Sequence, residues 1–255
     1  MATKRITAKN FIFALENEKF KEFVDKVEDL TKISEKMMFQ IQGDKILLYT
    51  IAGGRNIHAF KSHIFDLEEF TKKEAEDLKF IFSDAKKVVK TLSQFKEYDD
   101  DVKGKIVYNE DGFGEKLLMK NEKLKLEVGG GLPVTFQQTV KLEDLEKNLN
   151  IDDANFRFTL KKEDFTKIKK LGTIDNENEF YSLIVKNNKV IFGESSWTLE
   201  VDELESQNEQ VSFQKKYFNT IQYKNEDDVK IYVFSNKVLI NGNYTNLMIS
   251  TELNI

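Results

Sequence analysis

A strand that runs directly into a helix occurs four times in this sequence, and this repetition limits the possible folds more than any other feature. In each copy, an apolar run passes without a break into a segment with helical spacing. The four copies are NFIFALENEKFKEFVDKV (10–27), LKFIFSDAKKVVKTL (78–92), NFRFTLKKEDFTKIKKL (155–171) and EQVSFQKKYFNTI (209–221). Two copies lie in each half, and several strand-like runs follow each helix. We therefore expect an internal duplication, in which the second half repeats the order of elements of the first.

Short β-rich runs separated by turn residues make up most of the remaining sequence. Examples are KILLYTIA (45–52) after the pair Gly43–Asp44, and KVIFGE (189–194) after Asn187–Asn188. Runs joined by such short turns favour antiparallel hairpins. Helical spacing is confined to four segments, at 16–30, 83–95, 161–172 and 214–222. The fold class is therefore α+β, with antiparallel sheets and two helices in each half.

The stretch 129–153 separates the two halves. It holds three consecutive glycines, the single proline of the chain and an acidic run punctuated by leucines, so we interpret it as a connector. The expected domains are 1–128 and 154–255. A chain of 255 residues, 40% of them apolar, can build two cores of about 100–130 residues each.

Composition excludes several classes of protein. No apolar run approaches the ~20 residues of a membrane-spanning helix, and the N-terminus lacks the apolar middle of a signal peptide. The absence of cysteine excludes disulfide scaffolds and thiolate metal sites, so a cytoplasmic setting is expected. One proline, with many Lys, Asn, Ile and Phe residues, is typical of AT-rich coding, as in many bacteriophages.

No arrangement of residues predicts an active site, so we expect no enzymatic activity, cofactor or metal. The two glycine-rich stretches lack the lysine and hydroxyl residue of a nucleotide-binding loop. The two histidines, His58 and His63, are interpreted as surface residues on strands. Asp99–Asp101 is interpreted as an acidic loop, although three carboxylates can hold Mg²⁺. GESSW (193–197) lacks the second glycine of a nucleophile elbow.

The arrangement resembles the DNA sliding clamps, the processivity factors of replicative polymerases. The resemblance is strongest to the two-domain clamps of PCNA type and of T-even-like phages. The segments that carry it are the strand-to-helix units at 10–27 and 155–171, EFYSLIVKNNKVIF (179–192) and DDVKIYVFSNKVLINGNYTNLMISTEL (227–253). The resemblance implies two clamp domains per chain, with antiparallel sheets outside and helices lining a central channel for duplex DNA. It also implies a homotrimeric ring, a DNA polymerase partner and an ATP-dependent clamp loader.

Positive charge is concentrated on three of the four helical segments. The chain has 39 Lys+Arg against 44 Asp+Glu, yet segments 83–96, 161–171 and 214–224 each carry a net charge of +3. Basic helix faces suit phosphate contacts that are independent of sequence, whereas a single lysine-rich helix is also typical of a solvated face. The first helix is acidic, so its lysines are not included. The residues predicted to face DNA are Lys86, Lys87, Lys90, Lys162, Lys167, Lys170, Lys215 and Lys216.

A groove for partner peptides is a further implication of the resemblance. Sliding clamps bind short segments of polymerases and other proteins beside the connector between their domains. In this chain the groove would take apolar residues from the connector and the last strand. The candidates are Leu142, Leu145, Leu149, Met248 and Leu253. The alternative role for the leucines is local packing of the connector.

Two other interpretations stay open. One is a β-rich structural or assembly protein of a phage, without DNA binding, in which the duplication serves assembly symmetry. The other is a hydrolase whose paired carboxylates the sequence does not reveal. The repeated strand-to-helix units and their concentrated lysines favour the clamp over both.

Overall fold

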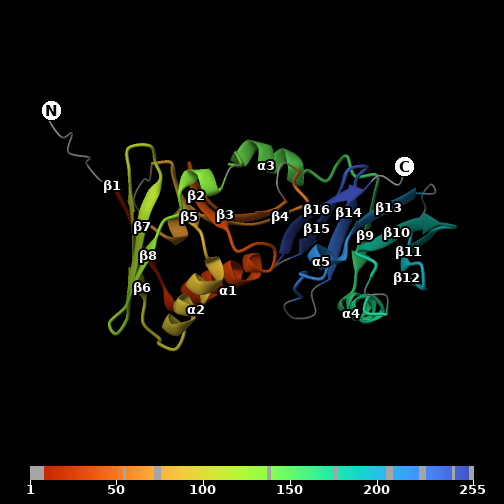
Figure 1. The fold of residues 1–255 in the computed structure, drawn as a ribbon, viewed down its shortest axis with the longest axis horizontal. Coiled ribbons are helices and arrows are strands. Elements are labelled where there is room, and N and C mark those ends of the chain that lie inside the picture. The colour runs from red at the N-terminus through yellow and green to blue at the C-terminus, as the bar shows by residue number, and fades with distance from the viewer. Residues whose placement is uncertain are drawn as a thin grey trace. The chain divides into compact units, whose positions relative to one another are not determined.

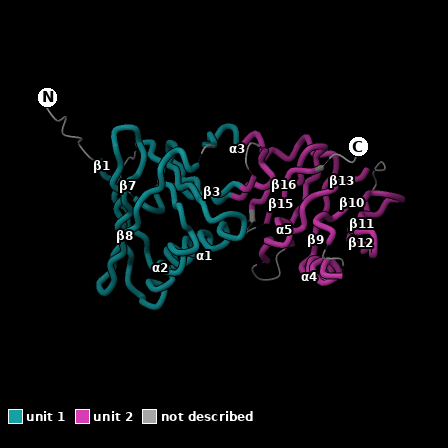
Figure 2. The backbone as a smooth tube through the Cα atoms, viewed as in Figure 1, with its two compact units in different colours: residues 1–51, 62–145 teal, residues 52–61, 146–255 magenta. Residues whose placement is uncertain are grey.

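The computed structural model describes residues 9–53, 56–71, 76–136, 139–174, 177–204, 209–223, 228–242 and 245–252. The chain divides into two compact units (Figure 2). Unit 1 comprises residues 1–51 and 62–145, and unit 2 comprises residues 52–61 and 146–255. The boundaries predicted for the connector, 129–153, stay a prediction. Among the described residues, no helix is long and apolar enough to cross a membrane.

Unit 1 consists of two antiparallel sheets and two helices (Figure 1). One sheet has the order β1-β6-β7-β8, and β5-β2-β3-β4 are neighbours in the other. One 3₁₀ turn, Leu67–Glu69, follows β4, and another, Pro133–Thr135, follows β8. The elements, in chain order, are β1 (Lys9–Leu15), α1 (Asn17–Thr31), β2 (Met37–Gln42), β3 (Lys45–Ala52), β4 (Ala59–Asp66), β5 (Leu78–Phe82), α2 (Ala85–Phe95), β6 (Val102–Tyr108), β7 (Gly114–Lys120) and β8 (Lys125–Gly129).

Unit 2 repeats this order element by element. Its strands follow the orders β9-β14-β15-β16 and β13-β10-β11-β12, which correspond strand for strand to the two sheets of unit 1, and β13 also pairs with β16. The predicted duplication and the α+β class are confirmed. The elements are β9 (Phe156–Leu160), α4 (Lys162–Leu171), β10 (Phe180–Lys186), β11 (Lys189–Glu194), β12 (Trp197–Glu203), β13 (Glu209–Gln214), α5 (Lys215–Phe218), β14 (Val229–Val233), β15 (Lys237–Gly242) and β16 (Thr245–Glu252).

Aromatic side chains form the core of unit 1 beneath α1 and α2. Apolar residues three and four apart give each helix one buried face. Phe20 of α1 meets Phe95 of α2 edge to face, with 5.9 Å between ring centroids. Phe23 of α1 packs against Phe70 in the same geometry, at 5.8 Å. The two helices therefore lie side by side over one core (Figure 1).

Phe218 is the centre of the core of unit 2. Its ring lies 5.5 Å from Phe165 of α4, 5.3 Å from Phe192 of β11 and 5.4 Å from Phe213 of β13. The side chain is fully buried. Large buried rings in such contact contribute strongly to stability, so this one residue ties α4 and α5 to the sheet.

The last predicted helix, 214–222, is wrong in extent, because α5 is a single turn, Lys215–Phe218. The backbone continues in tighter turns, with Thr220 N donating to Tyr217 O at 3.0 Å and Ile221 N to Phe218 O at 3.1 Å. Thr220 Oγ1 also donates to Tyr217 O, at 2.7 Å. Hydroxyl and β-branched side chains compete with or disfavour continued helix, which explains the early end.

The predicted connector contains a further helix, α3 (Leu142–Leu149), which is not among the four predicted helical segments. Glu143 and Asp144 lie in its first turn and Lys147 in its last, the charge order that the helix dipole favours. Its first residue is held within unit 1, since Leu142 N donates to Gln42 Oε1 at 2.7 Å.

The segment before α3 is fastened to the same strands. Val140 N donates to the hydroxyl of Tyr49 at 3.1 Å, and Gln42 Nε2 donates to Val140 O at 3.2 Å. The ring of Phe136 meets that of Tyr49 edge to face, at 5.6 Å. Tyr49 therefore fixes the path of the connector over β3, both through its ring and through its hydroxyl.

Candidate nucleic-acid interface and partner groove

Helix α2 presents three lysines to solvent. Asp84 caps it, because its carboxylate accepts a hydrogen bond from Lys87 N at 3.0 Å. Val88, Val89, Leu92 and Phe95 are buried, which leaves Lys86, Lys87 and Lys90 exposed on the opposite face, as predicted. Lys86 Nζ pairs with Glu35 at 2.9 Å, and both side chains are more than half exposed. Lys87 and Lys90 have no ion-pair partner among the described residues.

Helix α4 has the same construction in unit 2. Phe165 and Ile168 are buried, and the three predicted lysines, Lys162, Lys167 and Lys170, are exposed. Lys167 Nζ lies 2.9 Å from Asp164 Oδ1, one turn earlier. That hydrogen bond raises the pKa of Lys167, so its charge is retained at neutral pH.

Lys215 is not on the solvent-facing side of α5, and its prediction as a DNA contact is wrong. Its side chain is buried, and its Nζ lies 2.6 Å from Glu194 Oε1, whose side chain is fully buried. Gly172 O accepts a longer hydrogen bond from the same nitrogen, at 3.4 Å. Lys216, the next residue, is exposed as predicted and lies over the ring of Tyr217, 4.8 Å from its centroid.

The buried position of Lys215 follows from the strand rather than from the helix. Val211 and Phe213 face the core from β13, and Lys215 is the next residue on that face in period two. The prediction used helical spacing from Gln214 onwards. The signal that could have found the correct side was the alternation of the preceding strand.

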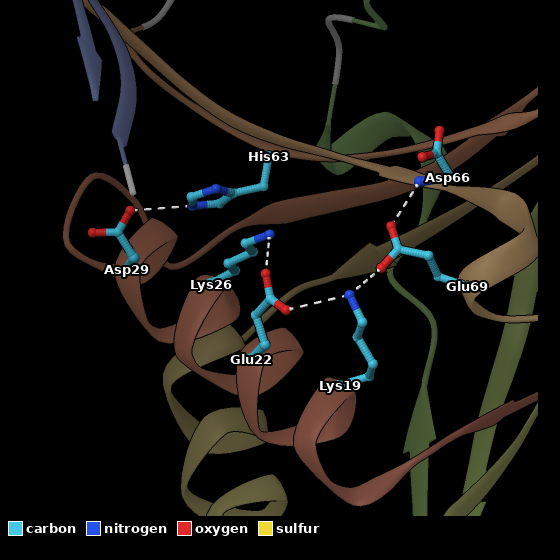
Figure 3. Close-up of polar contacts among 7 residues, drawn as sticks. All are labelled: Lys19, Glu22, Lys26, Asp29, His63, Asp66 and Glu69. Atoms are coloured by element: carbon cyan, nitrogen blue, oxygen red, sulfur yellow. Dashed lines mark hydrogen bonds and ion pairs between the residues drawn. The ribbon is translucent and has the colours of Figure 1, made fainter. Parts of the chain in front are cut away.

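Ion pairs within unit 1 neutralise much of the polar face of α1 (Figure 3). Lys19 Nζ contacts Glu69 Oε2 at 2.8 Å, and Lys26 Nζ contacts Glu22 Oε1 at 2.7 Å. Glu69 also accepts a hydrogen bond from Asp66 N, which closes the 3₁₀ turn after β4. The lysines of α1 are thus engaged with carboxylates, in keeping with their omission from the predicted interface.

The surface position predicted for both histidines is wrong for His63. Its side chain is buried on β4, and Nε2 lies 3.2 Å from Oδ2 of the fully buried Asp29 at the end of α1 (Figure 3). His58 is exposed. This contact joins α1 to β4 through a polar pair in the core, and the prediction missed it because Asp29 is distant in sequence.

A cluster of apolar residues on unit 2 brings together two of the predicted groove residues. Tyr232, Phe234 and Leu239 are buried, and Leu149 and Met248 pack against them, with Ile151 and Ala154 alongside. The register places Tyr232 opposite Leu239, and Leu239 opposite Met248. We call these seven residues the unit 2 cluster. Period-two spacing of Tyr232 and Phe234 was the signal that could have identified them.

The other predicted groove residues are placed differently. Leu145 is buried and Leu142 half-buried, and both belong to unit 1. Leu253 lies outside the described residues. The role predicted for Leu142 and Leu145 stays a prediction.

The described residues contain no group of three or more His, Asp or Glu side chains that could hold a metal ion. Asp99, in the acidic loop, lies 3.5 Å from Lys21 Nζ and accepts a hydrogen bond from Asn17 at 3.2 Å. These contacts hold Asp99 against α1.

Comparisons with known proteins establish the fold. No family model matches the chain, and no curated protein matches it in sequence. Solved structures do match. PCNA from Thermococcus kodakaraensis has 12% sequence identity and a TM-score of 0.65, over 96% of this chain and 100% of that one. The chain has the DNA sliding-clamp fold.

Two further sliding-clamp structures are similar. The PCNA2–PCNA3 complex from Sulfolobus tokodaii matches with a TM-score of 0.64 and 12% identity, over 95% of this chain and 99% of that one. The DNA polymerase III β subunit from Borrelia burgdorferi matches with a TM-score of 0.67 and 15% identity, over 96% of this chain. The chain spans 65% of the length of that bacterial subunit. The predicted resemblance to sliding clamps is confirmed at the level of the fold.

Proposed function

We propose that this chain is a DNA sliding clamp, a non-enzymatic ring that encircles duplex DNA and tethers a replicative polymerase in the cytoplasm. The observation that carries the proposal is the pair of amphipathic helices α2 and α4, one in each duplicated unit. Each buries an apolar face and leaves exposed lysines on the other. In the clamp fold these helices line the channel.

The lysines suit sliding rather than recognition. Lys87, Lys90 and Lys170 have no ion-pair partner among the described residues, so their charges are available to phosphates. Long, exposed lysine side chains make electrostatic contacts that carry no sequence information. Such contacts exchange easily as DNA moves, and closure of the ring, not their strength, prevents escape.

The duplication supports a specific way to close the ring. In unit 2, β16 lies beside the segment that enters β4, where Ser250 N donates to His58 O at 3.0 Å. By the correspondence between units, β8 is the counterpart of β16, and β12 is the counterpart of β4. Both β8 and β12 end their sheets within the chain. We infer that β8 of one copy pairs with β12 of the next, head to tail, in a trimer.

The unit 2 cluster would receive short apolar segments of the polymerase and of an ATP-dependent clamp loader. Partly buried Leu149, Ile151 and Met248 around buried Tyr232 and Leu239 offer the apolar anchor site that such peptides need. The composition of the chain supports a bacteriophage origin.

Processive synthesis on primed circular DNA, with polymerase and loader present, tests this function. A variant with Lys87→Glu and Lys90→Glu should fold and assemble like the wild type but support much shorter products. A variant that supports full-length products would remove the lysines of α2 from the DNA interface. Wild-type protein that does not lengthen the products would instead favour a β-rich phage structural or assembly protein.

A further inference from the structure

The outward face of the sheet β1-β6-β7-β8 has a shallow hollow with an apolar floor. Ile12 of β1 is 58% exposed, and Leu118 of β7 is half-buried. The strand register sets Lys105 of β6 between them, opposite Ile12 on one side and Leu118 on the other. The hollow measures ≈590 Å³, and the stems of Lys103, Lys105, Lys120 and Lys125 line it together with these two residues and with Glu127, whose carboxylate is paired with Lys116. Lysine stems are apolar, whereas their ammonium groups reach the rim.

Three of these lysines stand in one row across neighbouring strands. Lys103 is opposite Lys120, and Lys120 is opposite Lys125. Side chains at directly opposed positions have Cβ atoms about 5 Å apart, and like charges there are unfavourable. None of the three has an ion-pair partner among the described residues. Lys116 on the same face differs, because it is paired with Glu127 at 2.7 Å. The unpaired row costs stability that a bound anionic partner would restore.

The same face of the duplicated sheet in unit 2 carries the unit 2 cluster. Strands β9, β14, β15 and β16 correspond to β1, β6, β7 and β8. In unit 2 the outward row across the last three strands is Tyr232, Leu239 and Met248, all apolar. In unit 1 the corresponding row is Lys105, Leu118 and Glu127. The face keeps an apolar centre at Ile12 and Leu118, and charged side chains, most of them lysines, surround it. The two faces therefore share a position in the fold and differ in the partner chemistry that they suit.

We propose that the outward face of β1-β6-β7-β8 is a second docking surface, for an acidic segment of a partner protein. That segment would carry one or two large apolar side chains flanked by Asp or Glu. The apolar side chain fills the hollow, and the flanking carboxylates meet Lys103, Lys120 and Lys125. Duplex DNA fits less well, because a phosphate backbone has no apolar group to place against Ile12 and Leu118. A membrane surface fits less well, because the apolar residues line a hollow rather than a protrusion.

This surface does not depend on the ring or on DNA encirclement. Lys103 and Lys105 lie on β6, two strands from the end of the sheet at β8, or about 10 Å away at ordinary strand spacing. Pairing of β8 with another copy uses backbone groups at the edge, so the lysines of β6 remain accessible on the face.

A fluorescence titration tests the proposal, and the absence of cysteine in the chain makes the labelling site unique. Ala14→Cys places an environment-sensitive dye opposite Lys103 on the same face. The probe is a synthetic peptide with two leucines among Asp and Glu, compared with a peptide in which serines replace the leucines. We expect saturable binding of the leucine peptide, with roughly tenfold weaker binding in Lys103→Glu/Lys120→Glu, as for reversed close charge pairs. The serine peptide should bind several-fold more weakly than the leucine peptide.

Lys87→Glu/Lys90→Glu is the matched control, because it reverses the same number of exposed charges elsewhere in unit 1. It should bind the leucine peptide like the wild type. Conversely, the Lys103→Glu/Lys120→Glu variant should retain DNA binding, which separates this inference from the proposed function. Equal binding of both peptides, or unchanged binding to the Lys103→Glu/Lys120→Glu variant, would overturn the proposal. Binding of duplex DNA or of anionic phospholipid vesicles at the dye that is tighter than binding of the leucine peptide would also overturn it. Loss of self-association in the Lys103→Glu/Lys120→Glu variant would do the same.

Discussion

Lys215 Nζ and Glu194 Oε1 lie 2.6 Å apart in the interior of unit 2. The ring of Tyr181 lies beside the pair, with its centroid 5.4 Å from the same nitrogen. Burial, and secondarily the charge of Glu194, raise the pKa of the Tyr181 hydroxyl, although its hydrogen bond with Asn219 acts in the opposite direction. A lysine at the start of a basic turn thus holds β11 to α5 instead of facing solvent.

Removing one member of this pair should be costly. Lys215→Ala leaves a buried carboxylate without its partner, and we expect a loss of about 3–5 kcal/mol in the free energy of unfolding. The double variant Lys215→Met/Glu194→Leu should recover most of that loss. Burying two apolar side chains carries no desolvation penalty that a partner would have to offset. Urea unfolding of the three proteins measures both effects. A double variant as unstable as Lys215→Ala would contradict the account, as would a well-folded double variant that no longer binds DNA.

Neutralising the exposed lysines of α2 should weaken DNA binding in a salt-dependent way. For Lys87→Gln and Lys90→Gln, the slope of log affinity against log salt should fall by roughly one unit per lysine, since each contact releases counterions. Fluorescence anisotropy with labelled duplexes of two unrelated sequences gives the slopes, which should change equally for both. Lys103→Gln/Lys120→Gln removes the same charge from the sheet face and serves as the control. An equal decrease in the slope for the control and test variants would mean that net charge, not the position of the lysines, governs DNA binding.

Truncating the unit 2 cluster should weaken partner binding without affecting DNA. We expect Leu149→Ala/Met248→Ala to bind a synthetic peptide bearing one leucine and two phenylalanines roughly tenfold more weakly, since buried apolar anchors dominate such contacts. Isothermal titration with the intact protein provides the affinities. Leu142→Ala is the comparison variant, because Leu142 is half-buried but belongs to unit 1. If Leu142→Ala alone reproduced the loss, the binding site would have to be moved to the first turn of α3, in unit 1.

Ionisation of Tyr49 should make the protein less stable at alkaline pH. Burial raises its pKa to about 12, although the hydrogen bond from Val140 N opposes the shift. The unfolded chain releases this proton near the ordinary pKa of about 10. The contribution of Tyr49 is therefore complete below pH 10 and is lost as the pH rises towards 12.

Tyr49→Phe provides the corresponding test. At neutral pH it should cost about 1–3 kcal/mol, because Val140 N and Gln40 Oε1 lose their partner. Above pH 10 its free energy of unfolding should fall less steeply than that of the wild type. Parallel pH profiles for the two proteins would show that another group controls alkaline unfolding.

Local patterns were sufficient to predict much of the fold. The run from Asn10 to Val27 changes from period two to helical spacing at one point, and the structure has β1 and α1 on either side of it. Repetition of that change at Asn155 predicted the duplication. Lysine positions opposite the buried faces of α2 and α4 were also predictable, because an amphipathic helix fixes both faces at once.

Features that depend on distant residues were not predictable in this way. The alternation of β13 indicates that Lys215 faces the core, but it does not reveal the buried partner there, Glu194 of β11. His63 is buried because Asp29, which is distant in sequence, contacts it in the core. The helix α3 depends on Gln42 and Tyr49 to hold the segment before it and its first residue. In each case a tertiary contact is involved, and spacing along the sequence does not report that contact.

Retention on circular DNA tests whether the protein encircles DNA. The protein is incubated with a nicked circular plasmid, the proposed clamp loader and ATP, its subunits are cross-linked to one another, and the complex is separated from free protein at high salt. We expect cross-linked protein, with three times the 29.8 kDa mass of the chain, to stay with the circle. A single restriction cut should then release it. Retention that survives the cut, or no retention on the circle, would contradict encirclement of DNA.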